Sequence, residues 1–249
     1  MNASELIEPS GKVRLFVDAA LAGAARITLE DAPAHYLLHV MRAKAGAYLL
    51  LFNGRDGEWR ARIAETSKRS CVLQCEKRIR TQDAAPDVWL CFAPIKKTPA
   101  DYVVQKATEL GASVLQPVFT RRTIVARVNE ERMRANAVEA AEQSDRLTVP
   151  EVREPITLDK LLKSWPAERR MLFCDEGGDA QPIAKAVEQI AAKSVAILTG
   201  PEGGFNPAER DLIRSQGFVV PVTLGPRILR ADTAALASLA VLQALKGDW

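Results

Sequence analysis

Two glycine loops near the C-terminus constrain this chain most. Residues 195–198 are a short apolar run rich in branched side chains, typical of a buried strand, and they lead into the loop at residues 199–204. A second predicted strand, residues 218–224, leads into another glycine loop at residues 225–230. Ligands of open α/β sheets bind beyond the carboxyl ends of the strands. The sequence therefore predicts a ligand site where the two loops meet.

Helix signals follow both loops. Asn206 and Pro207 predict a helix start, with Asn206 as the cap and Pro207 at the first helical position. Asp232 or Thr233 is the predicted cap of a final helix over residues 234–245. That helix is more apolar than one face of a surface helix requires. It is either buried inside the monomer or part of a dimer interface.

The rest of the chain predicts two parts. Residues 12–80 contain several short alternating runs and one helix, which favours a small barrel, and residues 81–86 are a plausible linker. After the linker, strand and helix patterns alternate, and this indicates a mostly parallel sheet covered by helices. Predicted strands lie at residues 88–93, 114–119 and 171–174, and predicted helices at residues 101–110, 129–146 and 183–192.

Composition narrows the class of protein. With 47% hydrophobic and 26% charged residues, the sequence is typical of a soluble globular chain. No apolar run is long enough to span a bilayer, and residues 1–12 lack the hydrophobic region of a signal peptide. The four cysteines show no CxxC spacing, so reduced thiols and a cytoplasmic location are expected. The net charge of +3 is too small to indicate nucleic acid by itself.

Several basic and histidine residues allow two interpretations each. Lys96-Lys97 and Arg121-Arg122 follow strands of the predicted sheet, so they are either solvated charges or phosphate-positioning groups. His35 and His39 have a spacing that zinc could use, but no HExxH motif or cysteine partner accompanies them. We expect structural or RNA-facing histidines and no metal.

Longer motifs give the chain a family resemblance. Residues 200–205 read GPEGGF and residues 224–236 read LGPRILRADTAAL, with QKATELG at 105–111 and EQSDR at 142–146. Together they resemble the RsmE-type uridine-N3 methyltransferases of small-subunit ribosomal RNA, a branch of the SPOUT superfamily. The resemblance implies a PUA-like RNA-binding β-barrel over residues 1–80, a linker over 81–86 and an α/β SPOUT methyltransferase domain over 87–249. It also implies a C-terminal trefoil knot.

The resemblance implies S-adenosyl-L-methionine as the cofactor, held by the two loops. The residues expected to bind it are Leu198, Thr199, Gly200, Glu202, Gly203, Leu224, Gly225, Arg227, Ile228, Leu229 and Thr233. Arg230 is expected to stabilise the anionic base, and Glu202 to act as an acid/base or orienting group. Many family members have Glu where this chain has Asp232, so that shorter acid either keeps a role or only caps the helix.

The implied substrate is a uridine of 16S ribosomal RNA, in an assembled small-subunit particle, and the implied assembly is a homodimer without membrane contact. The residues expected to bind RNA are Arg14, Arg42, Lys44, Lys96, Lys97, Arg121, Arg122 and Arg146. Arg146 also has a simpler interpretation, a helical i,i+4 pair with Glu142. Two alternative functions stay open: ribose 2′-O-methylation of RNA, and a non-catalytic RNA-binding ribosome assembly factor.

Overall fold

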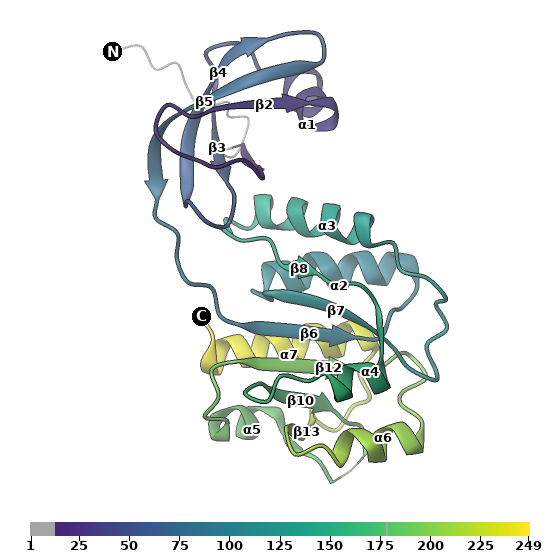
Figure 1. Cartoon of the computed structure of the whole chain (residues 1–249). Helices are drawn as coiled ribbons and strands as arrows, with labels where there is room; N and C mark the ends of the chain where they lie inside the picture. The colour runs from purple at the N-terminus through teal and green to yellow at the C-terminus, as the bar shows by residue number, and fades with distance from the viewer. Residues whose placement is uncertain (1–12, 178) are drawn as a thin grey trace. The chain divides into compact units, whose positions relative to one another are not determined.

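The computed structural model describes residues 13–177 and 179–249, and it separates into two compact units (Figure 1). The first unit runs to Ala84 and also includes Glu142–Val149; the second consists of Ala85–Ala141 and Pro150–Trp249. A segment from the middle of the sequence therefore packs with the N-terminal unit. The predicted division at residues 81–86 does not include this segment in the first unit.

The first unit is built on a five-stranded mixed sheet with the order β1-β3-β4-β5-β2. Only β1 and β3 pair in parallel; the remaining neighbours are antiparallel. The elements are β1 (Arg14–Phe16), β2 (Arg26–Glu30), α1 (Asp31–His35), the π-helix η1 (Tyr36–Val40), β3 (Tyr48–Phe52), β4 (Glu58–Thr66) and β5 (Ser70–Arg80). The predicted short strands and single helical segment are confirmed, and β5 continues five residues beyond the alternating run that the sequence shows at residues 71–75.

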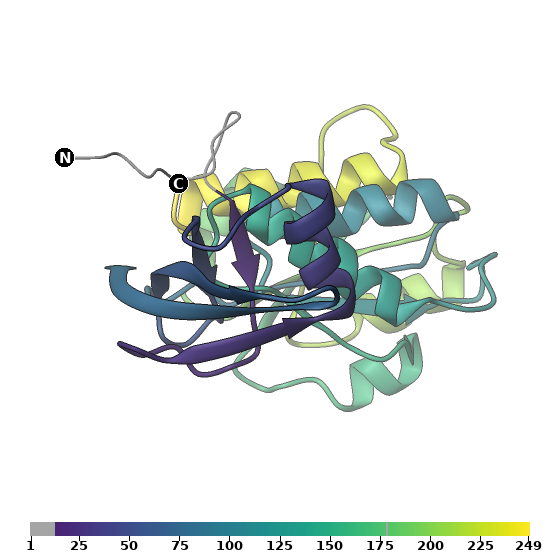
Figure 2. The same cartoon turned by 90° about the horizontal axis from the view of Figure 1, so that it is seen from above.

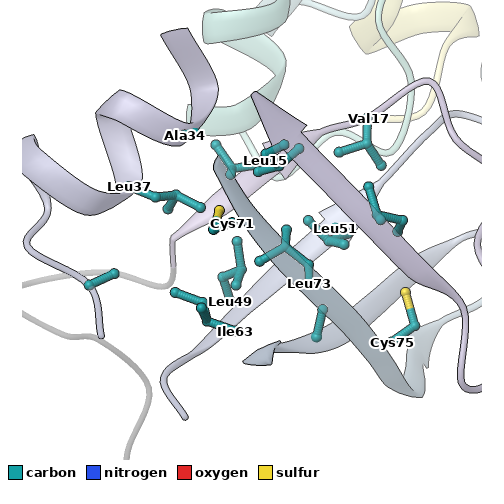
Figure 3. Close-up of a cluster of buried hydrophobic side chains, with 14 of the residues drawn as sticks. Leu15, Val17, Ala34, Leu37, Leu49, Leu51, Ile63, Cys71, Leu73 and Cys75 are labelled. Atoms are coloured by element: carbon teal, nitrogen blue, oxygen red, sulfur yellow. The ribbon is translucent and has the colours of Figure 1, made fainter. Parts of the chain in front are cut away.

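Apolar side chains from alternating strand positions form the core of this unit (Figure 3). Leu49 and Leu51 from β3 meet Ile63 from β4 and Leu73 from β5, and all four are at most 1% exposed. The thiols of Cys71 and Cys75 lie in the same cluster, where desolvation raises the pKa of both. These cysteines therefore serve packing, as their strand-like surroundings indicate.

The second unit contains an eight-stranded sheet in which every pairing is parallel. Its order is β11-β13-β10-β12-β6-β7-β8, with β9 pairing to β7. The prediction of an α/β fold with a mostly parallel sheet is confirmed. The strands are β6 (Val88–Phe92), β7 (Val114–Phe119), β8 (Glu151–Val152), β9 (Ile156–Thr157), β10 (Arg170–Cys174), β11 (Gln181–Pro182), β12 (Val195–Thr199) and β13 (Val219–Thr223).

The last helix lies alongside α2 in both views (Figures 1 and 2). It also packs against α5 and against strands β12 and β6, so it covers the middle of the sheet. No helix within the described residues is both long and apolar enough to cross a membrane. The helices of this unit are α2 (Lys97–Glu109), α3 (Glu130–Gln143), α4 (Leu158–Lys163), α5 (Ile183–Gln189), α6 (Pro207–Arg214) and α7 (Ala231–Lys246).

Four predicted helix boundaries are wrong. Helix α5 ends at Gln189, three residues before the predicted end at residue 192. Helix α7 begins at Ala231 with Arg230 in the cap position, so neither Asp232 nor Thr233 caps it; Asp232 instead places a carboxylate in the first turn. Helix α2 begins at Lys97, four residues early, because its first turn accommodates Pro99. Helix α3 ends at Gln143, and Asp145 follows with a φ of +58°. Arg146 therefore lies beyond the helix, so a pair with Glu142 would not be a pair within one helix.

Candidate functional site

The two glycine loops border one cavity of about 470 Å³. Strands β12 and β13 deliver the loops, and β10 lies between these strands in the sheet. Because all three run parallel, their carboxyl ends meet at one edge. The two loops therefore meet at the carboxyl ends of the strands, as predicted. Ligand pockets of proteins commonly have volumes of several hundred Å³, so this cavity suits a small molecule.

Most residues assigned to the cofactor site line this cavity. Those found in the lining are Thr199, Gly200, Glu202, Leu224, Gly225, Arg227, Ile228 and Leu229. Leu198, Gly203 and Thr233 are placed by the structure outside the lining. Leu198 is fully buried within β12, so its side chain belongs to the sheet rather than to the cavity.

The first loop, residues 200–204, is held tightly by its neighbours. A Cβ on Gly200 would stand 2.7 Å from the Phe205 ring, which packs edge-on against Phe173. Gly204 has a φ of +65°, and its amide donates to the Pro201 carbonyl oxygen at 2.9 Å. These positions require glycine, one for space and one for conformation.

A capping box closes the end of this loop. The Glu209 amide donates to Asn206 Oδ1 at 2.7 Å, and the Asn206 amide donates to Glu209 Oε2 at 3.2 Å. The predicted start of α6, with Asn206 as cap and Pro207 at the first position, is confirmed. The loop therefore runs directly into a well-fixed helix N-terminus.

Sequence reasoning missed the third strand end that contributes to the cavity. Cys174, the last residue of β10, and Asp175 and Glu176, which follow it, belong to the lining. Asp175 is buried and accepts hydrogen bonds from Arg210 Nε at 2.7 Å and Arg214 Nε at 2.6 Å. It therefore fastens α6 beside the cavity. The available signal was a carboxylate immediately after an apolar strand, which is the same signal as in the first loop.

The pKa values of three groups in this region are shifted. Desolvation raises the pKa of the Cys174 thiol to about 12, so this group is a neutral thiol near pH 7. A hydrogen bond from Arg214 lowers the pKa of Asp179, and Asp179 and Asp175 in turn raise that of Arg214. Arg214 and Asp179 therefore stay charged together over the ordinary pH range.

The chemistry of the lining suits a ligand with a flat apolar part and a positive charge. Ile95, Phe205 and Val222 give apolar wall, and the glycines leave backbone groups exposed to the cavity. Glu176, Glu202 and Asp232 add three carboxylates. Carboxylates favour a cation by charge, and open backbone gives hydrogen-bonding groups at short range.

The two residues assigned to catalysis lie in the lining with their side chains exposed. Arg230 caps α7 through its backbone, since the Ala234 amide donates to its carbonyl oxygen at 2.8 Å. Within the described part of the chain, neither its guanidinium nor the Glu202 carboxylate forms an ion pair. Both side chains are therefore available to a bound molecule.

The basic residues of the second unit occupy different settings. Lys96 and Arg121 are exposed, and the side chain of Lys97 lies outside the described residues. Arg122 Nη1 donates to the Gly203 carbonyl oxygen at 2.9 Å. Arg122 therefore contacts the first glycine loop, which its position in the sequence does not indicate.

Arg14, which we expected to bind RNA, is instead buried inside the first unit. Its guanidinium is buried, donates from Nε to Glu58 Oε1 at 2.7 Å and lies 4.6 Å from the centre of the Phe52 ring. It also donates to the carbonyl oxygens of Glu142 at 3.0 Å and Arg146 at 2.8 Å. Arg14 thus fixes the returning segment inside the first unit, because a buried charge needs such partners.

The other basic residues assigned to RNA in this unit are nearer the surface. Arg42 and Lys44 are exposed and follow the π-helix, and Arg42 has a φ of +53°. Arg146 is half-buried and donates to Thr148 Oγ1 at 3.0 Å. The rings of His35 and His39 are 4.9 Å apart. Among the described residues, no group of three or more histidine, cysteine or acidic side chains is arranged for a metal ion.

Two family models match the chain. An RNA methyltransferase domain matches residues 82–243, and an RNA methyltransferase PUA domain matches residues 29–75. Together they cover the parallel sheet with its cavity and most of the mixed sheet. The two parts inferred from the sequence therefore correspond to two known domain types.

The chain is similar to curated relatives and to solved structures over nearly its full length. The ribosomal RNA small subunit methyltransferase E of Rickettsia conorii is 32% identical over 234 residues, which are 93% of this chain and 95% of that protein. The protein of the same name from Synechocystis sp. is 33% identical, over 89% of this chain and 74% of its own length. The crystal structure of a ribosomal RNA small subunit methyltransferase E from Neisseria gonorrhoeae, bound to S-adenosyl methionine, superposes with a TM-score of 0.87 at 28% identity. That superposition covers 96% of this chain and all of the other.

Proposed function

This chain belongs to the family of ribosomal RNA small subunit methyltransferase E, and from this premise we propose that it transfers a methyl group from S-adenosyl-L-methionine to N3 of a uridine in 16S ribosomal RNA. One observation carries the proposal: two glycine loops, delivered by two parallel strands on either side of β10, border a single cavity of suitable size. Similarity to a protein crystallised with S-adenosyl methionine supports the identity of the cofactor.

The residues of the cavity fit this cofactor. Its adenine needs apolar wall and backbone partners, which Leu224, Gly225 and Leu229 with their neighbours offer. Its sulfonium and ammonium charges need nearby carboxylates, and Glu176, Glu202 and Asp232 lie in the lining. When bound, the cofactor supplies an activated methyl group, so the chain itself needs to supply only binding and proton chemistry.

The side chains of the chain then act on the uracil. N3 of uracil carries a proton, and it must lose that proton before its lone pair can attack. The charge that develops on the uracil oxygens needs a donor nearby, and the exposed guanidinium of Arg230 is suited to this role. Glu202 is the group we assign to orientation or proton removal. Because N3 lies on the pairing edge of the base, the target uridine must be unpaired or flipped out.

The first unit supplies RNA binding in this proposal. It contains the PUA match and presents Arg42 and Lys44 on its surface. Phosphate contacts from such residues position RNA without reading its sequence. We propose that the mixed sheet closes as a PUA-like barrel, and that an assembled small-subunit particle in the cytoplasm is the substrate.

A trefoil knot in the second unit is part of the same proposal. After β13 the chain must pass the end of β10, because α7 packs against β12, β6 and α2, and β10 lies between β13 and β12 in the sheet. Residues 224–230 make this passage and also line the cavity. A crossing of this kind is rare among protein folds, and it supports a threaded C-terminus.

We further propose a homodimer through α7. Leu236, Ala237, Ala240 and Val241 form a strip of one helix face that stays half exposed in the single chain. The substitution Ala237→Glu would put a charge into a dry interface, which is costly without a partner. Light scattering at micromolar concentration should give a dimer mass for the unaltered protein and a monomer mass for this variant; a monomer mass for both contradicts the proposal.

The function is tested with small-subunit particles from a strain that lacks this enzyme. Calorimetry first measures binding of S-adenosyl-L-methionine, and the particles are then incubated with protein and cofactor. The ribosomal RNA is digested to nucleosides for mass spectrometry, and a parallel sample is reverse-transcribed. We expect 3-methyluridine and a reverse-transcription stop at one position, because a methyl on N3 blocks the pairing edge.

The same experiment separates the alternatives. A product with the methyl on the ribose gives 2′-O-methyluridine and a linkage resistant to alkali, and it would replace our proposal with ribose methylation. Cofactor binding without methyl transfer would favour a non-catalytic assembly factor. Naked 16S RNA in place of particles is the control for the proposed assembled substrate.

A further inference from the structure

Two neighbouring arginines after β7, Arg121 and Arg122, are held in opposite ways. Arg122 directs its side chain to the first glycine loop and donates from Nη1 to the Gly203 carbonyl oxygen at 2.9 Å. A Cβ built on Gly203 would stand 3.6 Å from Arg122 Cβ and 3.7 Å from its Cδ. The aliphatic stem of Arg122 therefore lies against the loop, while its head binds the loop backbone.

Arg121 is fixed by its backbone instead. Its amide donates to Glu209 Oε1 at 2.7 Å, and its side chain is exposed and forms no ion pair within the described part of the chain. Glu209 is only 8% exposed, and its other oxygen, Oε2, accepts from the Asn206 amide. One buried carboxylate thus joins the turn after β7 to the helix start that follows the glycine loop.

The turn that carries the arginines has its own hydrogen bonds. The Thr120 amide donates to Thr123 Oγ1 at 2.9 Å, and the Thr123 amide donates back to the Thr120 carbonyl oxygen at 3.2 Å. The hydroxyls of the two threonines lie 3.0 Å apart. Such local side-chain bonds stabilise a tight turn, so Arg122 extends from a stiff base.

We propose that Arg122 is a positioning residue for the cofactor loop, whereas Arg121 presents its guanidinium to RNA phosphate. The proposal rests on the function proposed above, in which residues 200–204 bind S-adenosyl-L-methionine. A bond to the Gly203 carbonyl oxygen fixes the peptide plane between Gly203 and Gly204. That plane sets the direction of the Glu202 segment, which lines the cavity, and a loop held in its binding conformation gives higher affinity than a free one.

The test compares Arg122→Ala, Arg122→Lys and Arg121→Ala in the full chain. Calorimetry with S-adenosyl-L-methionine should show a loss of affinity of about 3- to 10-fold for Arg122→Ala, the range of one hydrogen bond. Arg122→Lys keeps a donor and should recover part of the loss. Arg121→Ala should bind the cofactor within about twofold of the unaltered protein but bind 16S RNA more weakly, with a shallower dependence on salt.

Kinetics distinguish positioning from general damage to the structure. For Arg122→Ala we expect a higher KM for the cofactor with KM for RNA unchanged, and for Arg121→Ala the reverse. Glu209→Gln removes the charge that joins the two segments and should also raise the KM for the cofactor alone. This variant provides the test if Arg122→Ala does not fold.

Different results would contradict the proposed function and the positioning role of Arg122. If the unaltered protein does not bind S-adenosyl-L-methionine, the proposed function fails. If it binds, and the folded arginine or glutamine variant keeps the affinity of the unaltered protein, the positioning role is overturned. Loss of RNA affinity alone in Arg122→Ala would also overturn it, because Arg122 would then be a phosphate contact.

Discussion

The two glycine loops border the same cavity but are held very differently. Residues 200–204 contact Phe205 and Arg122 and continue into a capping box. Among the residues that the structure describes, residues 225–230 have only local hydrogen bonds at their ends, between Thr223 and Gly225 and from the Ala234 amide to the Arg230 carbonyl oxygen. Within the described part of the chain, residues 227–229 form no hydrogen bond, and Ile228 is 85% exposed.

Both sides of the cavity have the same sequence signal, a glycine loop after a strand. Only the first loop, however, is already held in one conformation before a ligand binds. The first loop is a fixed wall, so a ligand meets it in its final conformation. The second loop is free to adjust, and a ligand must order it at some cost in entropy. Substitutions in the two loops should therefore have unequal consequences, and the predictions below test this from the largest effect to the smallest.

The largest effect is expected for Gly200→Val. The new side chain would overlap the Phe205 ring, which cannot move away easily because Phe173 lies behind it. We expect loss of detectable cofactor binding by calorimetry, and a fall in the free energy of unfolding of about 1–3 kcal/mol in urea. Gly217→Val is the matched control, since a Cβ there meets nothing within 4 Å. Equal behaviour of the two variants would contradict a tightly held first loop.

A smaller effect separates Gly204→Ala from Gly225→Ala. Both glycines have positive φ, +65° and +105°, so alanine is strained at either position. A Cβ on Gly204 would stand 2.6 Å from Glu176 Oε1, and the Gly204 amide is bonded within its loop, so Gly204→Ala should lose about 1–2 kcal/mol of unfolding free energy. Gly225 has open space around it, and its loop can relax, so the loss there should be smaller. Urea denaturation of both variants measures the two losses of unfolding free energy. A larger loss for Gly225→Ala than for Gly204→Ala would contradict the comparison of the loops.

Local signals explain why so much of this site could be predicted. The buried strand before each loop, the glycines and the Asn206-Pro207 helix start all lie within a few neighbouring residues. After residue 87, strands and helices alternate, which predicts a parallel sheet. In such a sheet both loops lie at the same edge, as the structure shows. These features depend on short-range sequence patterns, which a single chain displays directly.

What the sequence could not show depends on contacts between distant residues. Arginine is usually found at the protein surface, yet Arg14 is buried. Its guanidinium donates to the carbonyl oxygen of Glu142, 128 positions away in the sequence. Arg122 and Gly203 are 81 positions apart, and nothing in either motif indicates their bond. The contribution of Glu176 became visible only once the sheet order placed β10 between β12 and β13.

Hydrogen exchange should display the contrast in the unaltered protein. The Gly204 amide is bonded to the Pro201 carbonyl oxygen, so it should exchange more slowly than the amides of residues 227–229. Adding S-adenosyl-L-methionine should slow exchange in residues 227–229 more than in residues 202–204, because only the second loop becomes ordered. Peptide-level mass spectrometry with and without cofactor measures this. Equal protection of the two loops without cofactor would remove the basis of the comparison.

The smallest effect is expected for Ile228→Ala. At 85% exposure the side chain contributes little packing, so the free energy of unfolding should stay within about 0.5 kcal/mol of the unaltered protein. Its position in the cavity lining allows a modest contact with cofactor, and we expect affinity to change by less than about threefold, which is below one ordinary hydrogen bond. Calorimetry and urea denaturation give both numbers. A much larger loss of affinity without loss of stability would mean that the second loop closes on the cofactor and buries Ile228. The two loops would then differ only before binding, and the free loop would supply as much of the binding energy as the fixed one.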